Sequence, residues 1–81
     1  MSDDLRNKLR EIIAEVAEID EVPDATLFSD LGIDSMMAIE IVAEVEREFR
    51  LSIPEDELGD LIHLNAVFEN VQTKLDGAAA E

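Results

Sequence analysis

Apolar residues recur every three or four positions in three segments of the chain, and this spacing places them on one face of a helix. The segments predict helices over about 3–18, 35–50 and 64–75. Their apolar stripes are Leu5, Leu9, Ile12, Ile13 and Val16 in the first, Ala38, Ile41, Val42, Val45 and Phe49 in the second, and Leu64, Val67, Phe68, Val71 and Leu75 in the third. Because no such helix buries its stripe alone, we expect the three to pack together.

The connections between these segments carry turn residues. The stretch 20–34 holds Pro23 and Gly32 and reads as a long loop, yet its apolar residues predict that it packs down onto the helices. Those residues are Val22, Leu27, Phe28, Leu31 and Ile33. Pro54 suits the first turn of a short helix or turn over 55–60, limited by Gly59.

Asp76 and Gly77 are expected to end the last helix. This predicts a single domain over 1–76 and a flexible tail over 77–81. The fold class that follows is all-α: a four-helix bundle of three longer helices and one short helix.

Charge narrows the choice of partners. The 81 residues hold 21 acids and 6 bases, for a net charge of −15. Arg6, Lys8 and Arg10 lie near the start, and no Lys or Arg occurs between Glu11 and Glu46. Nucleic acid is therefore excluded as a direct ligand, and proteins with basic patches are the expected partners.

The composition also excludes several chemistries. The chain has no cysteine, which rules out disulfides and thiolate sites. It has no apolar run of the roughly 20 residues that a membrane span needs, and the N-terminal sequence has no signal segment. We expect a cytoplasmic monomer.

Ser35 is the main candidate for chemistry, because it stands with Asp34 at the start of the second predicted helix. Either residue can cap the helix by accepting from free backbone N–H groups. The same N–H groups and the helix dipole also favour a phosphate-linked group on the serine hydroxyl. A nucleophilic serine is disfavoured, since His63 is the only histidine and no Gly-x-Ser-x-Gly elbow exists.

Other polar groups predict no further site. His63 is expected to be structural, because a metal ligand needs companions and there is no second histidine. Glu55, Asp56, Glu57 and Asp60 cluster without the EF-hand pattern, so no dedicated metal site is expected. No catalytic residue is predicted either.

Met36 is predicted to face outward, in the middle of an arc that carries Glu40, Ala43, Glu44, Arg47 and Arg50. An exposed, flexible apolar residue beside acids suits a protein contact. Met37 lies at the margin of the core stripe and is expected to fill a gap there.

The stretch FSDLGIDSM, from Phe28 to Met36, resembles the F-x-(D/E)-L-G-x-D-S-(L/M) signature of acyl carrier proteins. The likeness continues through AIEIVAEVEREF and LSIPEDEL and covers about Leu5 to Leu75. Met37 and Arg47 stand where many fatty-acid carriers have acids, and His63 replaces a common Thr. DSMMAIEI is closer to the DSLMAVEL stretch of polyketide synthase carriers.

The resemblance implies an acyl-carrier-like four-helix fold and a covalent 4'-phosphopantetheine on Ser35. A phosphopantetheinyl transferase would attach this group from coenzyme A, with Asp34 assisting. The arm's thiol would then carry acyl groups as thioesters, so the protein would be a carrier and not an enzyme.

The resemblance also implies that the second helix is the recognition helix, with Glu40 and Glu46 at acidic positions. The expected partners are the transferase and ketosynthase- and acyltransferase-type enzymes, which would contact Met36, Glu40 and Glu44. Polyketide biosynthesis is the expected pathway. A fatty-acid synthase carrier, a peptidyl or aminoacyl carrier, and an unmodified acidic interaction module remain alternatives.

Overall fold

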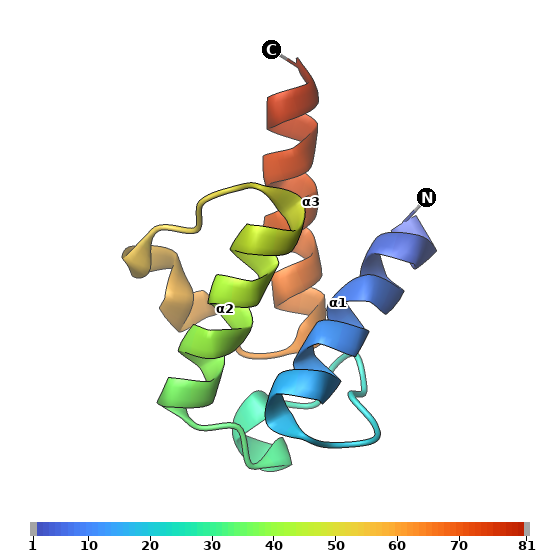
Figure 1. Ribbon diagram of the computed structural model, residues 1–81, viewed down its shortest axis with the longest axis vertical. Helices are drawn as coiled ribbons and strands as arrows, with labels where there is room; N and C mark the ends of the chain where they lie inside the picture. Colours follow the sequence, from blue (N-terminus) through green and yellow to red (C-terminus); the bar gives the residue numbers. More distant parts are fainter. Residues whose placement is uncertain (1, 81) are drawn as a thin grey trace.

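Three α-helices and two short 3₁₀ helices make up the described part of the chain, residues 2–80 of the computed structural model (Figure 1). They are α1 (Ser2–Ala17), η1 (Phe28–Leu31), α2 (Ser35–Phe49), η2 (Glu55–Asp60) and α3 (Leu64–Ala80). These residues contain no strand, which confirms the all-α prediction, and η2 is the predicted short helix. None of the helices in this part is long and apolar enough to cross a membrane.

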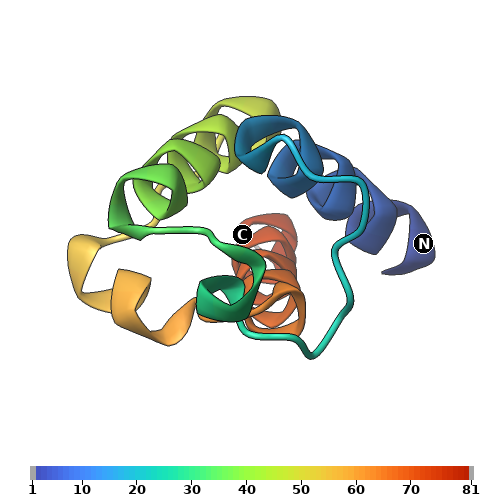
Figure 2. The same cartoon turned by 90° about the horizontal axis from the view of Figure 1, so that it is seen from below.

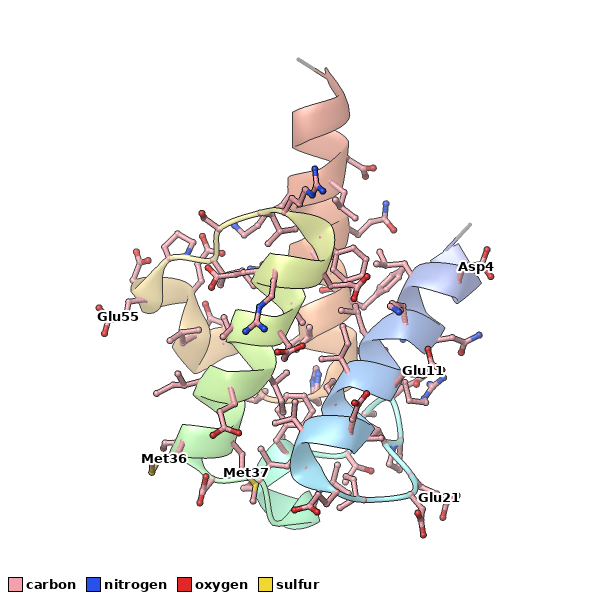
Figure 3. The ribbon with its side chains drawn as sticks, viewed as in Figure 1. Asp4, Glu11, Glu21, Met36, Met37 and Glu55 are labelled. Atoms are coloured by element: carbon pink, nitrogen blue, oxygen red, sulfur yellow. The ribbon has the colours of Figure 1, made fainter. Side chains whose placement is uncertain are left out.

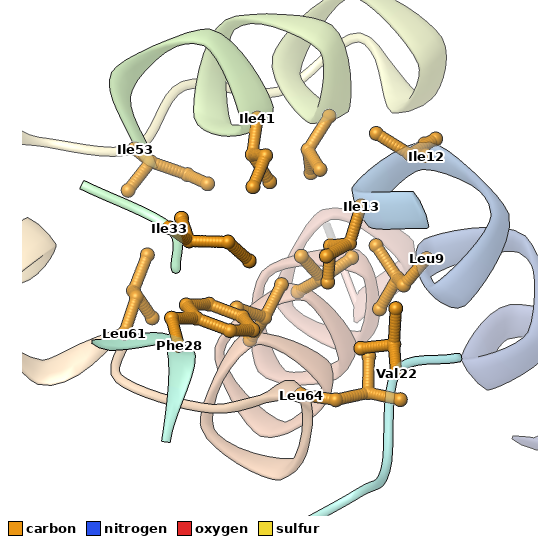
Figure 4. Packing of buried hydrophobic residues seen from close by; sticks show 13 residues of the cluster. Leu9, Ile12, Ile13, Val22, Phe28, Ile33, Ile41, Ile53, Leu61 and Leu64 are labelled. Carbon is orange, nitrogen blue, oxygen red and sulfur yellow. The ribbon is translucent and has the colours of Figure 1, made fainter. Parts of the chain in front are cut away.

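The three α-helices surround one core. Seen from below, α1 and α2 lie side by side and α3 packs under the pair (Figure 2). Residues from every apolar stripe are buried, together with side chains from the connections (Figure 4). The buried set is Leu9, Ile12, Ile13, Val22, Phe28, Ile33, Ile41, Val45, Ile53, Leu61, Leu64, Val67 and Val71. Each fully buried Leu, Ile or Val side chain stabilises the fold by about 1.5–3 kcal/mol, so these stripes supply the main driving force.

The long loop before α2 is packed down as predicted. Val22, Phe28 and Ile33 are buried within it, whereas Leu27 is 39% exposed. Gly32 ends η1 with φ +81°, the left-handed conformation that makes a glycine useful at this turn. The loop therefore holds the start of α2 against the core.

A polar clamp fastens the middle of that loop. The Asp24 carboxylate pairs with the guanidinium groups of Arg6 and Arg10, both on α1. The backbone carbonyl of Asp24 accepts the N–H of Asn65 at 3.0 Å, at the start of α3. Arg6 also lies over the ring of Phe68, 4.3 Å from its centroid. Two of the three basic residues near the start of the chain, Arg6 and Arg10, thus stabilise the fold.

The predicted end of the last helix is wrong. α3 continues through Asp76 and Gly77 to Ala80. A glycine inside a helix costs about 1 kcal/mol relative to Ala, and the strong helix formers Ala78–Ala80 follow it. The flexibility of 77–81 stays a prediction, and Glu81 lies outside the described residues.

η2 is held to α3 by polar contacts. Glu57 accepts from Lys74 at 2.8 Å and from the side-chain amide of Asn70 at 2.7 Å. Gly59 lies inside this short helix and not at its end. Leu58 is half-buried and Leu61, directly after η2, is buried, so the segment covers one side of the core.

Candidate functional site

Ser35 is the first residue of α2, and the residue before it caps the helix. The Oδ1 atom of Asp34 accepts the N–H of Met37 at 2.9 Å, and its backbone carbonyl accepts the N–H of Ala38 at 2.9 Å. Of the two capping candidates in the sequence, Asp34 is therefore the cap. The amides of Ser35 and Met36 have no protein acceptor within residues 2–80, so they remain open at the positive end of the helix dipole.

The Ser35 side chain is exposed and borders two hollows. The first, of about 260 Å³, lies between α2, η2 and α3, and its walls are mostly apolar. The second, of about 330 Å³, extends toward the loop and η1. Phe28, Ala38, Leu58 and Leu61 line both hollows. A group attached at the hydroxyl would therefore lie beside apolar surface on either side.

Sequence reasoning missed the contribution of η2 to these walls. Leu58 and Leu61 are three residues apart, the spacing that puts two side chains on one face of a 3₁₀ helix. That spacing was a usable signal, but the cluster of acids around these leucines gave the segment the pattern of a solvated turn.

Exposed apolar side chains flank Ser35 on α2. Met36 is 73% exposed and Ile39 is 57% exposed, so the prediction that Met36 faces outward is confirmed. Met37 is half-buried against the core, also as predicted. Figure 3 shows the two methionines on opposite sides of the start of α2, with Met36 pointing away from α1. The serine thus adjoins exposed apolar side chains.

The acids on α2 fall into different environments. Glu40 is exposed, while Glu44 is half-buried and 3.2 Å from Arg47. Glu46 is half-buried as well, and its Oε2 accepts the N–H of Ile53 at 2.7 Å. The resemblance places Glu46 among the recognition acids, but in this chain it anchors the α2–η2 connection.

His63 caps α3. Its Nδ1 atom accepts the N–H of Ala66 at 3.0 Å, a hydrogen bond that a capping Thr or Ser usually provides. The structural role expected for His63 is therefore confirmed. The cap could not be derived from sequence because His is an uncommon residue at this position.

The acidic cluster of η2 is partly tied to α3. Hydrogen bonds from Lys74 and Asn70 favour the charged form of Glu57 and hold its pKa below the ordinary value of 4.5. Glu55, Asp56 and Asp60 are exposed. Across residues 2–80, no three side chains of the His, Cys, Asp or Glu type come together as a metal site.

The start of α2 fits a phosphate-linked substituent. A phosphodiester on Ser35 would meet open amides and the positive helix end, which stabilise negative charge. The exposed hydroxyl gives an enzyme direct access to it. No general base contacts this hydroxyl within the described residues.

Comparison with known proteins agrees with this geometry. Residues 7–68 match the family described as the phosphopantetheine attachment site. The chain is 37% identical over 73 residues to polyketide-8 synthase acyl carrier protein 2 of Streptomyces avermitilis, covering 86% of this chain and 84% of that protein. It is also 34% identical over 77 residues to a non-reducing polyketide synthase of Emericella nidulans, covering 93% of this chain but only 3% of the synthase.

The fold has a solved counterpart. The type II acyl carrier protein BlmI of Streptomyces verticillus, described as involved in bleomycin biosynthesis, superimposes with a TM-score of 0.82. The two chains are 24% identical, and the match covers 91% of this chain and 89% of the other. This structural likeness supports the fold, whereas the family match over residues 7–68 and the similar relatives support membership of the family. The chain belongs to the phosphopantetheine-attachment family of acyl carrier proteins, whose prosthetic group is covalently bound 4'-phosphopantetheine.

Proposed function

We propose that Ser35 is the attachment residue and that the chain carries thioester-bound acyl intermediates in polyketide biosynthesis. The observation that supports this most directly is the exposed Ser35 hydroxyl at an Asp34-capped helix start. A phosphopantetheinyl transferase would add the group from coenzyme A, and the group's thiol would supply the thioester chemistry. The chain itself positions Ser35 and presents apolar hollows beside it.

The polyketide assignment is supported by the relatives. The carrier from Streptomyces avermitilis and the synthase from Emericella nidulans both have polyketide synthase in their names. The chain spans about 3% of that synthase, so the domain occurs both as a small protein and within large ones. Fatty-acid and aminoacyl carriage are the competing assignments, and the identity of the loaded acyl group decides between them.

The partner surface in this proposal is the start of α2. Met36 gives apolar contact, while Glu40 and Glu44 give negative charge toward basic patches of the transferase, ketosynthase- and acyltransferase-type enzymes. We place the protein in the cytoplasm as a monomer. A net charge of −15 supports the monomeric state, because copies of the chain repel one another.

The test is a mass measurement on the intact protein. The chain is incubated with coenzyme A and a broad-specificity phosphopantetheinyl transferase and then weighed. We expect the wild type to gain one phosphopantetheine and Ser35→Ala to gain none. Ser29→Ala and Ser52→Ala, which remove other exposed serine hydroxyls, should gain the full mass. A mass gain on Ser35→Ala, or none on the wild type with several transferases, would show that the proposal is wrong and favour an unmodified interaction module.

A further inference from the structure

A groove separates α1 from α2 on a face that the Ser35 hollows do not share. It measures about 590 Å³, and residues of these two helices alone line it. Its apolar part consists of Ile12 and Val16 from α1 and Ala43 from α2. Ile12 is nearly buried, whereas Ala43 is exposed. The groove therefore has a narrow apolar floor that is open to solvent.

Two rows of carboxylates flank this floor. Glu11 and Glu15 are four residues apart on α1, and Glu40, Glu44 and Glu48 repeat at the same spacing on α2. Residues four apart lie one above the other on a helix, so each row runs along its own helix. Both rows line the same groove.

The cations of the groove pair with only two of its five acids, both on α2. Lys8 lies 3.9 Å from Glu48, and Arg47 lies 3.2 Å from Glu44. No such pair within residues 2–80 involves Glu11, Glu15 or Glu40. These three acids lie toward the end of α1 and the start of α2, which run alongside each other in opposite directions (Figure 1). One end of the groove is thus strongly negative.

This arrangement works against the stability of the isolated protein. Like charges four residues apart on a helix repel each other. The last turn of α1 has no basic residue, and Glu15 stands near the negative end of that helix dipole. A bound cationic partner would remove both costs. A single metal ion does not fit, because the acids are spread along two helices and form no three-ligand group within the described chain.

From these observations we propose that the α1–α2 groove is a docking site for a basic amphipathic helix of a partner protein. Such a helix would lay small apolar side chains on Ile12, Val16 and Ala43 and direct Lys or Arg toward the carboxylate rows. The site goes beyond the proposed modification of Ser35. It leaves the serine and both of its hollows uncovered, and it shares Glu40 and Glu44 with the partner surface proposed above.

The ligand for the test is a fluorescein-labelled helical peptide of about 14 residues, built from Ala, Leu and Lys with the lysines on one face. Anisotropy measures its affinity, and NMR shifts of the ¹⁵N-labelled protein locate it. We expect binding that weakens with salt and shifts centred on α1 and α2. In the triple variant Glu11→Gln, Glu15→Gln, Glu40→Gln, affinity should fall about tenfold.

The matched control is Glu55→Gln, Asp56→Asn, Glu69→Gln, which removes the same charge from exposed positions on η2 and α3. It should lose less than about threefold in affinity. Equal losses in the two triple variants, or shifts centred on Ser35, would overturn the groove as a specific site. So would a dimer in sedimentation that only the groove variant abolishes, because a second copy would then be the occupant.

The test also separates this inference from the function of Ser35. Ser35→Ala should bind the peptide as the wild type does. Because Glu40 and Glu44 belong to both surfaces, bound peptide should slow the modification of the wild type by the transferase without changing its site. If the wild type is never modified while the peptide maps to the groove, the proposed attachment is wrong and the docking site stands.

Discussion

The carboxylate of Glu46 accepts the backbone N–H of Ile53 at 2.7 Å, so the end of α2 holds the start of the connection that leads to η2. Ile53 is nearly buried, and its N–H has limited access to water. This bond joins the end of α2 to the segment that leads into η2, whose Leu58 lines the hollow beside Ser35. An acid that the resemblance assigns to partner recognition therefore has a structural role.

Glu46→Ala should lower the free energy of unfolding by about 1–3 kcal/mol, because the Ile53 N–H loses its acceptor. Glu46→Gln retains a side-chain oxygen at the same distance along the side chain, so its free energy of unfolding should fall by clearly less. Urea unfolding measures both variants. Equal and small losses would mean that water replaces the carboxylate.

Asp34→Ala should destabilise the protein by about 1 kcal/mol, since it removes the acceptor for the Met37 N–H. Asp34→Asn keeps an oxygen in that place and should unfold near the wild-type urea concentration. Its rate of modification by the transferase should nevertheless fall if the charge of Asp34 assists that step. A modification rate that follows stability alone would reduce the role of Asp34 to capping.

Arg50→Gly should stabilise the protein by about 0.5–1 kcal/mol. Arg50 ends α2 with φ +54°, a left-handed conformation that costs energy in any residue with a Cβ. The control is Arg47→Gly, three residues earlier inside the helix, which should cost about 1 kcal/mol. Thermal melts of the two variants should shift in opposite directions. Glu18 has φ +56° just after α1, and Glu18→Gly should repeat the gain.

Glu57 should contribute to stability in a pH-dependent way. Lys74 and Asn70 keep its pKa below 4.5 in the folded protein, so the folded state favours the ionised form. The contribution is then present above pH 4.5 and is lost as the pH falls through the lower folded value. Glu57→Gln should unfold at a lower urea concentration than the wild type at about pH 7, and the difference should shrink as the pH falls below the folded pKa of Glu57. In a Lys74→Met background, the difference at pH 7 should shrink.

Met36→Glu should leave the melting temperature unchanged, because this side chain is 73% exposed. It should raise the KM of the transferase about fivefold, on the order of 1 kcal/mol of lost contact energy. Met37→Glu is the contrasting variant. Its half-buried side chain packs against the core, so the melting temperature should fall.

The sequence predicted the parts of the fold that a repeating local pattern encodes. The stripe through Ile41 and Val45 located α2 correctly from its first residue, because burying one helix face imposes a period of 3.6 residues. α3 was predicted too short because Gly77 was interpreted as the end of the helix. A helix tolerates a glycine in its interior at modest cost.

The tertiary part of the site was harder to predict. That Ser35 starts α2 followed from its neighbours in sequence. The pairing of Asp24 with Arg6 and Arg10 and the contact of Glu46 with Ile53 depend on how the helices are placed. The hollows beside Ser35 also depend on how the helices are placed, because side chains of η1, α2, η2 and α3 line them together.

The clamp at Asp24 affects how far a carrier of this shape can deliver its cargo. The loop before α2 is fixed at Asp24 and again at Phe28, whose N–H donates to the carbonyl of Ile62 at 2.8 Å. The backbone that leads to Ser35 is therefore anchored to the helices at two points. Under the function proposed above, movement of the cargo toward a partner's active site would come from the arm on Ser35 and from tumbling of the whole bundle, so the length of the arm would set the distance that the cargo reaches.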